Sequence, residues 1–571
     1  MLLHEFAFLS LATLRDLVVY YALYQILKWL LRPFYSNSPL REVPGPLPQS
    51  WFKGNLGQLF SAKGLPFHRD LVARYGGMVK VYGFFGDEQL YISDPHALHR
   101  ILIKDQDAYE ETSVFVETNN VIFGPGLVST IGDIHKRQRR LVQPIFSPSN
   151  LRDLVPVFYA VAERLSDVLG REIRSRPDSG GSRVLDMSEW LSRAALESAG
   201  QAILGYSFDP LDSPVNNPYT NAVRELIPKM FSLSLVRQFA PFLVRMGPPW
   251  FRRKLVEWTP NEAVQRVKEM SDVMHETAQS ILSDARKGLL REMQENTDME
   301  TRSKDVISLL LRANQNASDA EQLRDAELTG QMTVMIFGAQ DTSASALSRI
   351  MYILSIRPDI QEKVRAEFQA AHISTSLEDR LSWEAISALP MLDAVLKETL
   401  RLYPPVPFVR RTATAEVALP FTSASGIASS VVVPRGTTLF VCIAGANRLK
   451  SVWGPDAEDW KPERWLKGEL HHKVDPDIRL PGVFAGTLSF LGGARSCVGT
   501  SGYKFAQIEI KIILVALLSR FRFSATQDDI VWNLSQIISP SVRTVEGGKT
   551  VERKGLPLQI KLIDHKHGYS Q

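Results

Sequence analysis

The spacing of apolar side chains along the chain predicts a mainly helical fold. Apolar residues recur at three- and four-residue intervals around 255–290 and around 327–357, which is the period of an amphipathic helix. Short runs rich in β-branched and aromatic residues lie near 77–92, at Thr438–Cys442 and at Leu556–Leu562, and such runs are typical of strands. We therefore expect a mainly α fold with small β-sheets at one side.

The N-terminal residues are predominantly apolar and predict a single membrane anchor helix at 1–32. Its cleanest apolar run, Leu17–Leu31, has 15 residues and would extend over about 22 Å as a helix. A hydrocarbon core is about 30 Å thick, and extending the run toward the N-terminus would bury Arg15 and Asp16. A tilted span and a helix lying in the interface both remain open. Basic residues follow the run, so the positive-inside bias places the rest of the chain in the cytosol.

A proline-rich segment, 33–48, separates the anchor from the remaining chain. Its prolines prevent a helix and predict a stiff, extended hinge. We expect one globular domain over 49–571. A polar stretch at Ser175–Ser182 predicts an exposed loop between helices of that domain.

The composition is that of a folded protein with a sizeable core. Hydrophobic residues make up 44% of the chain and charged residues 22%. The net charge of +4 is too small to indicate a nucleic-acid partner, but it suits acidic proteins or anionic lipid surfaces. The sequence contains two cysteines, Cys442 and Cys497. No intrachain disulfide is possible if one of them is a ligand, so the globular part need not fold in an oxidising compartment.

The stretch Phe490–Gly499 presents one cysteine in a glycine-rich loop. Gly492 and Gly493 permit a tight turn and a close approach of the backbone to a ligand. Arg495 carries a positive charge close to Cys497 along the chain, which favours the thiolate. A single thiolate cannot build a zinc or iron–sulfur site, which needs about four ligands, but it can be the axial ligand of a haem iron.

This loop, with the pattern F-x-x-G-x-R-x-C-x-G, resembles the cysteine-ligand loop of the cytochrome P-450 family. The resemblance implies the cytochrome P-450 fold, with haem b (iron protoporphyrin IX) as the cofactor. It makes Cys497 the ligand of the haem iron and places Phe490, Arg495 and Gly499 around the cofactor. The alternative interpretation is a buried structural cysteine in a glycine-rich turn.

The match has one departure after the loop. Thr500–Gly502 stands between Gly499 and the sequence Tyr503–Glu509, whereas the family runs almost directly from the loop into a helix. Three residues are nearly one helical turn, so a bulge would keep the helix face. A helix N-terminus displaced from the thiolate, which would weaken the haem site, and a gene-model error remain as alternatives.

Asp341 and Thr342 lie side by side within the second helical pattern. A carboxylate beside a hydroxyl is what a proton relay to bound dioxygen requires, and the small residues Gly338 and Ala339 would let a flat ligand approach the backbone. The run resembles the central-helix motif of the family, which implies a catalytic role for Asp341 and Thr342. Ala339 replaces the usual second glycine, so we expect less local widening of the helix. Close helix packing is the alternative for such small residues.

Glu398 and Arg401 are three positions apart on one predicted helix face and can form an ion pair. An ordinary surface pair is the alternative for such a spacing. The continuation into Leu402–Pro407, and a later segment that contains Arg464, resemble the buried Glu–Arg–Arg cluster of the family. The resemblance therefore makes Glu398, Arg401 and Arg464 structural residues behind the haem.

His135 and Arg139 are four positions apart and share one face of a basic helix. The family has tryptophan and arginine at these positions, where they bind a haem propionate, and histidine can also donate to a carboxylate. Arg411 is a second propionate candidate by the same resemblance. Three further basic residues of the helix form either a solvated face or a docking surface for an acidic reductase domain: Lys136, Arg137 and Arg140.

The segments that resemble the substrate-facing parts of the family are Ser113–Thr130, Asn221–Trp250, Gln331–Phe337, Val406–Val409 and Gln536–Ser539. Their side chains are largely apolar, which suits a terpenoid, a sterol or a fatty acyl chain that enters from the membrane. Each of these side chains, taken singly, is more typical of ordinary core. The apolar candidates are Val114, Phe115, Val121, Ile122, Phe123, Phe231, Leu235, Met335, Phe408, Ile537 and Ile538.

Together these resemblances imply a membrane-anchored haem-thiolate monooxygenase of the endoplasmic reticulum, with its catalytic domain in the cytosol. The implied partners are O2, a hydrophobic small molecule, membrane lipid and an NADPH–cytochrome P-450 reductase, with no nucleic acid. Two alternatives remain open. One is a reductase-independent haem-thiolate isomerase or dehydratase, against which the Asp341–Thr342 pair argues; the other is a non-catalytic haem protein.

Overall fold

The computed structural model describes most of the chain after residue 37. The described residues are 38–175, 181–212, 218–295, 303–375, 380–423, 426–466, 479–498 and 502–563, together with Asp16, Tyr20, Tyr21 and Tyr24. Apart from those four residues, the predicted anchor at 1–32 lies outside the described part. Within that part, no helix is both long enough and apolar enough to cross a bilayer.

The end of the predicted hinge packs against the body of the protein. Leu40 and Val43 are buried, and the Lys80 backbone N–H donates to Pro44 O (2.8 Å). A Cβ on Gly45 would lie 1.9 Å from Lys80 O, so glycine is required for this close approach. The residues around Pro44 are therefore fixed on the domain rather than free of it.

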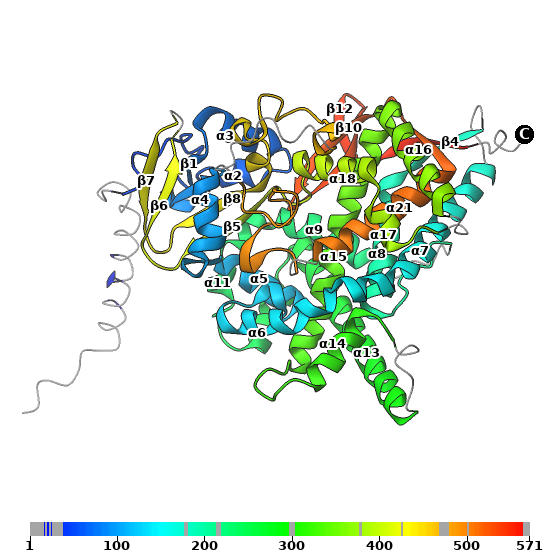
Figure 1. Ribbon diagram of the computed structural model, residues 1–571. Coiled ribbons are helices and arrows are strands. Elements are labelled where there is room, and N and C mark those ends of the chain that lie inside the picture. The colour runs from blue at the N-terminus through cyan, green and yellow to red at the C-terminus, as the bar shows by residue number, and fades with distance from the viewer. Residues whose placement is uncertain are drawn as a thin grey trace, which may run out of the picture.

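A long central helix, α15 (Asp325–Ile356), runs through the helical part of the molecule (Figure 1). It confirms the helix predicted around 327–357. Its packing partners are α8 (Met187–Ala199), α13 (Glu262–Gln294), α18 (Pro390–Leu402) and α21 (Gly502–Arg520). Because neighbours surround it, most residues of α15 are buried, including polar ones such as Gln331 and Ser343. The predicted proton relay therefore sits in the middle of the protein.

The predicted helix around 255–290 is two helices instead of one. The first, α12 (Pro249–Trp258), ends before Pro260, which has no amide hydrogen to continue it. The Asn261 side chain then accepts a hydrogen bond from the Val264 backbone N–H (3.1 Å) and caps α13. The apolar periodicity continues across this break, so the sequence pattern alone did not show where the first helix ends and the second begins.

The remaining helices fall into a longer and a shorter group. The longer ones are α3 (Leu65–Tyr75), α5 (Ser113–Phe123), α6 (Gly132–Val142), α7 (Pro148–Ser175), α9 (Pro218–Ser232), α14 (Val306–Gln315) and α16 (Pro358–Thr375). The short ones are α2 (Leu56–Leu59), α4 (Pro95–His99), α10 (Ser234–Arg237), α11 (Ala240–Leu243), α17 (Trp383–Ser387), α19 (Ile443–Ala446) and α20 (Lys450–Trp453).

The largest sheet has the strand order β1-β2-β8-β5-β3 and stands to one side of the helical part (Figure 1). Its strands are β1 (Met78–Tyr82), β2 (Glu88–Ile92), β8 (Thr438–Cys442), β5 (Phe408–Ala413) and β3 (Tyr109–Glu111). The β2–β8 pair is parallel, with Leu90 opposite Leu439, and the other pairs are antiparallel. The strands predicted near 77–92 and at 438–442 are therefore confirmed, and they are neighbours.

Three smaller sheets lie elsewhere on the molecule. Their strands, in spatial order, are β4 (Ser182–Asp186), β13 (Pro557–Leu562) and β9 (Phe521–Ala525); β10 (Asp529–Ser535), β11 (Ile537–Glu546) and β12 (Lys549–Lys554); and β6 (Val417–Thr422) and β7 (Ala428–Val433). The strand β13 confirms the one predicted at Leu556–Leu562. Ser182, predicted to end an exposed loop, is buried at the start of β4 instead.

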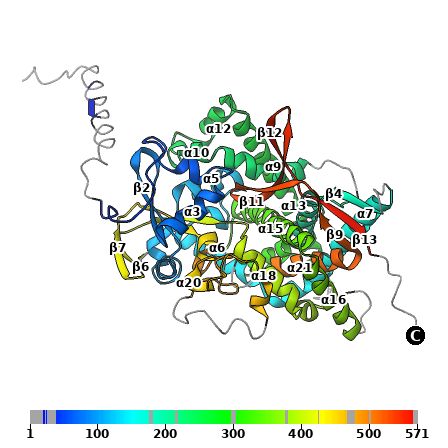
Figure 2. The same ribbon diagram turned by 90° about the horizontal axis from the view of Figure 1, so that it is seen from above.

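The hairpin of β10 and β11 reaches toward the central helix. Gln536 joins the two strands with a φ of +72°, in the left-handed region. The Ser345 hydroxyl of α15 donates to Ile538 O of β11 (2.6 Å). Viewed from above, β11 lies alongside α15 (Figure 2). This contact holds one predicted substrate-facing segment next to the helix of the predicted proton relay.

Candidate functional site

The loop that carries Cys497 is held by the backbone of the protein itself. Gly493 has a φ of +72°, and a Cβ there would lie 1.8 Å from Leu102 O. A Cβ on Gly492 would lie 1.7 Å from Pro481 O. Both contacts are too short for any side chain, so glycine is required at both positions. The predicted close approach exists, but it is made to neighbouring loops of the chain.

Cys497 combines exposed surface with a position deep in the protein. Its backbone N–H donates to Phe490 O (3.0 Å), and the residue keeps accessible surface, so the side chain borders an internal space. Burial raises the pKa of the thiol, whereas the backbone N–H of Val498 and the Arg139 guanidinium lower it. Arg139 is fixed beside the loop because it donates to Ser496 O (2.9 Å). The thiol therefore faces open space next to a guanidinium.

The positive charge beside the thiol comes from Arg139 rather than from Arg495. The Arg495 side chain donates to Thr130 O (3.0 Å) and forms an ion pair with Glu110 (2.6 Å). Arg495 stands two residues before Cys497 in the sequence, but its side chain is bound to these two partners instead of the sulfur. The expected thiolate stabilisation by Arg495 is corrected in favour of Arg139, which arrives from α6.

The helix α21 begins directly beside the sulfur. Residues 499–501, which include the predicted cofactor-binding Gly499, lie outside the described part of the chain. Gly502 begins α21, its N–H donates to Val498 O (2.8 Å), and a Cβ on it would lie 3.2 Å from Cys497 Sγ. The extra residues have therefore not moved the helix N-terminus away from the thiol. The dipole of α21 favours the thiolate there.

The three predicted propionate ligands, His135, Arg139 and Arg411, form one cationic cluster with Arg495. Burial, together with the guanidinium groups of Arg495 and Arg139, lowers the pKa of His135 to about 3, and Arg411 contributes in the same direction. Arg411 is buried in an ion pair with Glu111 (2.8 Å). Burial raises the pKa of the Glu111 carboxyl despite that partner. At neutral pH His135 is uncharged and donates one N–H only.

This cluster fits an acidic cofactor. Its three guanidinium groups face two carboxylates, and Nη2 of Arg411 is buried without a hydrogen-bond partner among the described residues. A buried N–H donor without an acceptor costs free energy, so this site favours a ligand that brings additional hydrogen-bond acceptors. The two propionates of a haem would supply them. The thiol of Cys497 is the matching ligand for its iron.

Thr342 and Gly338 present polar groups on one side of α15. The Thr342 hydroxyl donates to Gly338 O (2.7 Å), one helical turn earlier. Gly338 is exposed although α15 is buried along most of its length, so the helix borders an internal space here. The helix is continuous α-helix through Ala339, in line with the expected small widening. A hydroxyl at such an edge can hold or pass on a proton.

Asp341 points to a different side of the same helix. It lines a small pocket with Ser192, Ser348 and Lys554. Burial raises the pKa of the Asp341 carboxyl to about 6, although Lys554 acts in the opposite direction. The two predicted catalytic residues are therefore adjacent in sequence but face different surroundings. Asp341 is suited to exchange protons near neutral pH.

A buried acid on α21 belongs to the same region and was not among the predicted site residues. Glu509 accepts a hydrogen bond from the Ser343 hydroxyl (2.7 Å), which joins α21 to α15 next to Thr342. Burial raises the pKa of the Glu509 carboxyl to about 8, and its Oε1 has no partner in the described structure. The signal for it was a lone acidic residue between Ile508 and Ile510 in an apolar helix.

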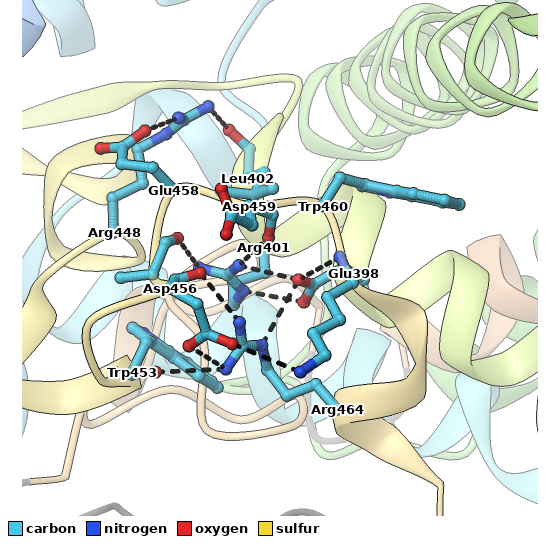
Figure 3. A network of polar contacts seen from close by, with 12 residues as sticks. Glu398, Arg401, Leu402, Arg448, Trp453, Asp456, Glu458, Asp459, Trp460 and Arg464 are labelled. Carbon is cyan, nitrogen blue, oxygen red and sulfur yellow. Dashed lines mark hydrogen bonds and ion pairs between the residues drawn. The ribbon is translucent and has the colours of Figure 1, made fainter. Parts of the chain in front are cut away.

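The predicted structural cluster is present and buried (Figure 3). Arg401 contacts both carboxylate oxygens of Glu398, at 2.8 Å each, and neither side chain is exposed. Arg464 approaches the same carboxylate (3.4 Å). Arg401 also donates to Asn447 O (2.9 Å) and Ala457 O (2.7 Å). The cluster ties α18 to the segment that precedes the cysteine loop.

The second cysteine lies in a separate polar group under the large sheet. The Cys442 thiol donates to Tyr91 Oη (2.9 Å), which is also 2.8 Å from His68 Nδ1. Burial raises the pKa of Cys442 to about 11, so this sulfur stays protonated.

The predicted apolar lining divides between different parts of the protein. Phe123 of α5 and Phe337 of α15 contact each other, with ring centroids 4.7 Å apart. Phe408 instead packs on His68 (4.9 Å) on the sheet side. Val121 is 63% exposed. Phe123 is therefore a predicted lining residue that lies beside the central helix, as do Met335 on α15 itself and Ile538 on β11.

Comparison with known proteins agrees with this site. The sequence model of the cytochrome P-450 family matches residues 44–544. The chain is 37% identical to cytochrome P-450 monooxygenase 81 of Postia placenta, over 94% of this chain and 96% of the relative. It is 34% identical to a ganoderic acid synthetase of Ganoderma lucidum, again over 94% and 96%. The chain therefore belongs to the cytochrome P-450 family of haem-thiolate enzymes and is an oxidoreductase of the monooxygenase class.

Proposed function

We propose that the enzyme inserts one oxygen atom from O2 into a hydrophobic small molecule, such as a terpenoid, a sterol or another secondary metabolite. Haem b is the proposed cofactor, and NADPH supplies electrons through a cytochrome P-450 reductase. The observation that carries the proposal is the Cys497 thiol, which borders an internal space between Arg139 and the N-terminus of α21. When bound, the haem supplies the activation of dioxygen.

The side chains of this enzyme have separate tasks in that reaction. Cys497 would hold the iron, and Arg139, Arg411 and Arg495 would bind the propionates. The Thr342 hydroxyl, fixed by Gly338 O, holds a proton at the edge of the internal space. Asp341 lines a small pocket with Lys554 and can exchange protons near neutral pH because its pKa is raised to about 6.

Apolar side chains support a hydrophobic substrate. Phe123 and Phe337 contact each other beside α15, close to Gly338 along the helix. Ile537 and Ile538 follow the turn that is hydrogen-bonded to α15. Such walls bind a molecule mainly by removing its apolar surface from water.

A membrane location, with the catalytic domain facing the cytosol at the endoplasmic reticulum, is supported by an exposed apolar surface. Ring contacts connect its parts, since Phe84 lies 5.3 Å from Phe52 and 5.3 Å from Phe239. Large exposed apolar patches mark membrane or protein contacts, and aromatic side chains favour the lipid interface. The exposed apolar residues of this surface are Leu47, Trp51, Phe52, Val236, Phe239, Phe242, Leu243, Met246 and Trp250.

Electron delivery would use the basic face of α6. Arg137 forms a part-buried ion pair with Glu327 and is withdrawn from that face. Lys136 and Arg140 are exposed, although each has an acidic neighbour, Asp107 (3.5 Å) for Lys136 and Glu321 (3.0 Å) for Arg140. Lys136 and Arg140 are therefore the proposed contacts for an acidic reductase domain.

A carbon monoxide difference spectrum of the reduced protein tests the proposal. The wild type is expected to give the strongly red-shifted band of a thiolate-ligated haem, and Cys497→Ser is expected to lose both that band and turnover. Substrate-dependent NADPH consumption with a reductase present separates a monooxygenase from a reductase-independent isomerase. A Cys497→Ser protein that keeps the band and its activity would refute the proposal.

A further inference from the structure

Two half-buried arginines, Arg237 of α10 and Arg410 of β5, have no carboxylate partner in the described structure. Arg237 Nη1 donates to Gln536 Oε1 (3.4 Å), and Arg410 Nη1 donates to Gln238 Oε1 (2.9 Å). Both acceptors are neutral amides. Nε of Arg237 is buried without any hydrogen-bond partner among the described residues. Two half-buried positive charges thus have amide oxygens in place of counter-ions.

The electrostatics of the pair show that the two charges act on each other. Burial lowers the pKa of both Arg237 and Arg410 to about 10, and the charge of Arg237 contributes to the lowering at Arg410. The acidic group that acts on Arg410 is Glu111, which is already bound by Arg411 at 2.8 Å. Both guanidinium groups remain protonated at neutral pH. A half-buried pair of like charges is unfavourable unless an anion joins it.

Arg401 and Arg193, two other arginines with little exposure, have carboxylate partners. Arg401 contacts Glu398 at 2.8 Å, and Arg193 contacts Asp209 at 2.7 Å. Arg237 and Arg410 differ from them in this respect.

The position of the pair points to the substrate. Arg237, Arg410 and Gln536 come from three chain segments: α10, β5 and the β10–β11 turn, which is hydrogen-bonded to α15 through Ile538 O. All three segments lie in or next to ranges predicted to face the substrate. The Arg410 guanidinium also lies over the rings of Phe60 (5.2 Å) and Phe440 (5.9 Å). A cationic end next to apolar and aromatic walls suits an amphiphilic anion.

We propose that Arg237 and Arg410 together bind the carboxylate of a hydrophobic acid, which makes this enzyme selective for anionic over neutral substrates. The proposal rests on the proposed function, since it names the substrate class of that same site. A carboxylate offers two oxygens with several acceptor positions, so it can bind both guanidinium forks at once. Gln238 and Gln536 hold the two forks in place until the carboxylate arrives.

Equilibrium binding of matched probes to the haem-loaded full-length protein tests this assignment. The probes are dodecanoic acid with its methyl ester, and abietic acid with its methyl ester, titrated by calorimetry at neutral pH. We expect at least one acid to bind about 10- to 100-fold more tightly than its ester, because a charge-assisted contact is lost in the ester. Equal affinity within each pair would overturn the proposal without any variant.

Variants then assign the preference to the two arginines. Arg237→Gln and Arg410→Gln are expected to reduce the acid-over-ester ratio about tenfold each, whereas Arg410→Lys keeps part of it. Arg245→Gln is the matched control, because it removes one exposed charge from the same region and should leave the ratio unchanged. An unchanged ratio in both glutamine variants, or an equal loss in Arg245→Gln, would contradict the proposal.

The carbon monoxide spectrum keeps this test separate from the test of the proposed function. A wild type without the thiolate band fails as a monooxygenase, whatever it binds. A wild type with the band but without acid preference refutes the carboxylate site alone. If a glutamine variant lowers thermal stability and leaves the acid-over-ester ratio intact, the two arginines are structural and the proposal is wrong.

Discussion

Ser343 and Glu509 form a buried hydrogen bond of 2.7 Å between the central helix and the helix that follows the cysteine loop. Ser343 is the neighbour of Thr342, and Glu509 lies on α21, which begins beside the Cys497 sulfur. The bond therefore joins the two parts of the site that must keep a fixed separation. Its strength depends on the protonation of an acid that has no charged partner in the described structure.

Glu509 is expected to make stability fall with rising pH. Burial raises the pKa of its carboxyl from 4.5 to about 8 in the folded protein. The folded chain thus binds more protons than the unfolded chain between these values, so the free energy of unfolding decreases as the pH rises from about 4.5 to about 8. Glu509→Gln should flatten this slope and be the more stable protein above about pH 8.

Urea unfolding of wild type and Glu509→Gln across this pH range measures the difference. The exposed Glu384, which pairs with Arg152 at the surface, gives the control variant Glu384→Gln. That variant should keep the wild-type slope. A wild type and a Glu509→Gln protein with parallel pH profiles would show that Glu509 does not carry the buried proton.

Arg401→Ala is expected to prevent haem retention and to destabilise the fold by about 3–5 kcal/mol, because it leaves the Glu398 carboxylate buried without its main partner. Haem content per chain and chemical unfolding check both effects. Arg253→Ala breaks an exposed pair with Asp272 and should cost no more than about 1 kcal/mol. Normal haem content in Arg401→Ala would contradict a structural role for this cluster.

Gly493→Ala is expected to abolish the cysteine loop. The new Cβ would lie 1.8 Å from Leu102 O, so the loop or its neighbour must move. Gly486 also has a positive φ, +62°, but has open space around it. Gly486→Ala should therefore cost only about 1 kcal/mol of conformational strain. Similar unfolding midpoints and similar haem spectra for the two variants would show that the backbone contact at Gly493 is not required.

Asp341→Asn is expected to lower kcat about 100-fold by removing a carboxyl group that can exchange protons near neutral pH. In the wild type, turnover should fall as the pH rises through about 6, because the protonated fraction of Asp341 declines there. The variant should lack this inflection. The pH profile of kcat measures it, and the product formed per NADPH consumed should fall in Thr342→Ala.

A pH profile with the same inflection in Asp341→Asn would assign the titration to another group. Glu509 is distinguishable, because its pKa is about 8 rather than about 6. Glu509→Gln serves as the second control in the same experiment.

Local motifs allowed much of the site to be predicted from the sequence. The cysteine loop and the Glu398–Arg401 pair are short segments whose residues act on their own neighbours, so their spacing is informative. Gly492 and Gly493 indicated a close backbone approach, although the sequence could not name its partners, Pro481 O and Leu102 O. The central helix was also clear, because its apolar positions continue over many turns.

Contacts between distant segments could not be predicted in the same way. Arg495 is near Cys497 in sequence, yet its side chain turns to Glu110, and Arg139 arrives at the thiol from α6. Arg410 and Gln238 are 172 positions apart, so their bond depends on how α10 meets β5. Packing decides such pairs, and no local pattern records it.

The two cysteines differ in their expected reactivity, so a thiol reagent can measure how much of the enzyme contains haem. The Cys442 thiol donates a hydrogen bond to Tyr91 Oη, and burial raises its pKa. Alkylating reagents should therefore not modify it. The Cys497 side chain is accessible, and its sulfur would be blocked once it binds the haem iron. A maleimide added to folded protein should therefore label Cys497 only in molecules without haem. Mass spectrometry of the labelled protein then gives the haem-free fraction without the need for a chromophore.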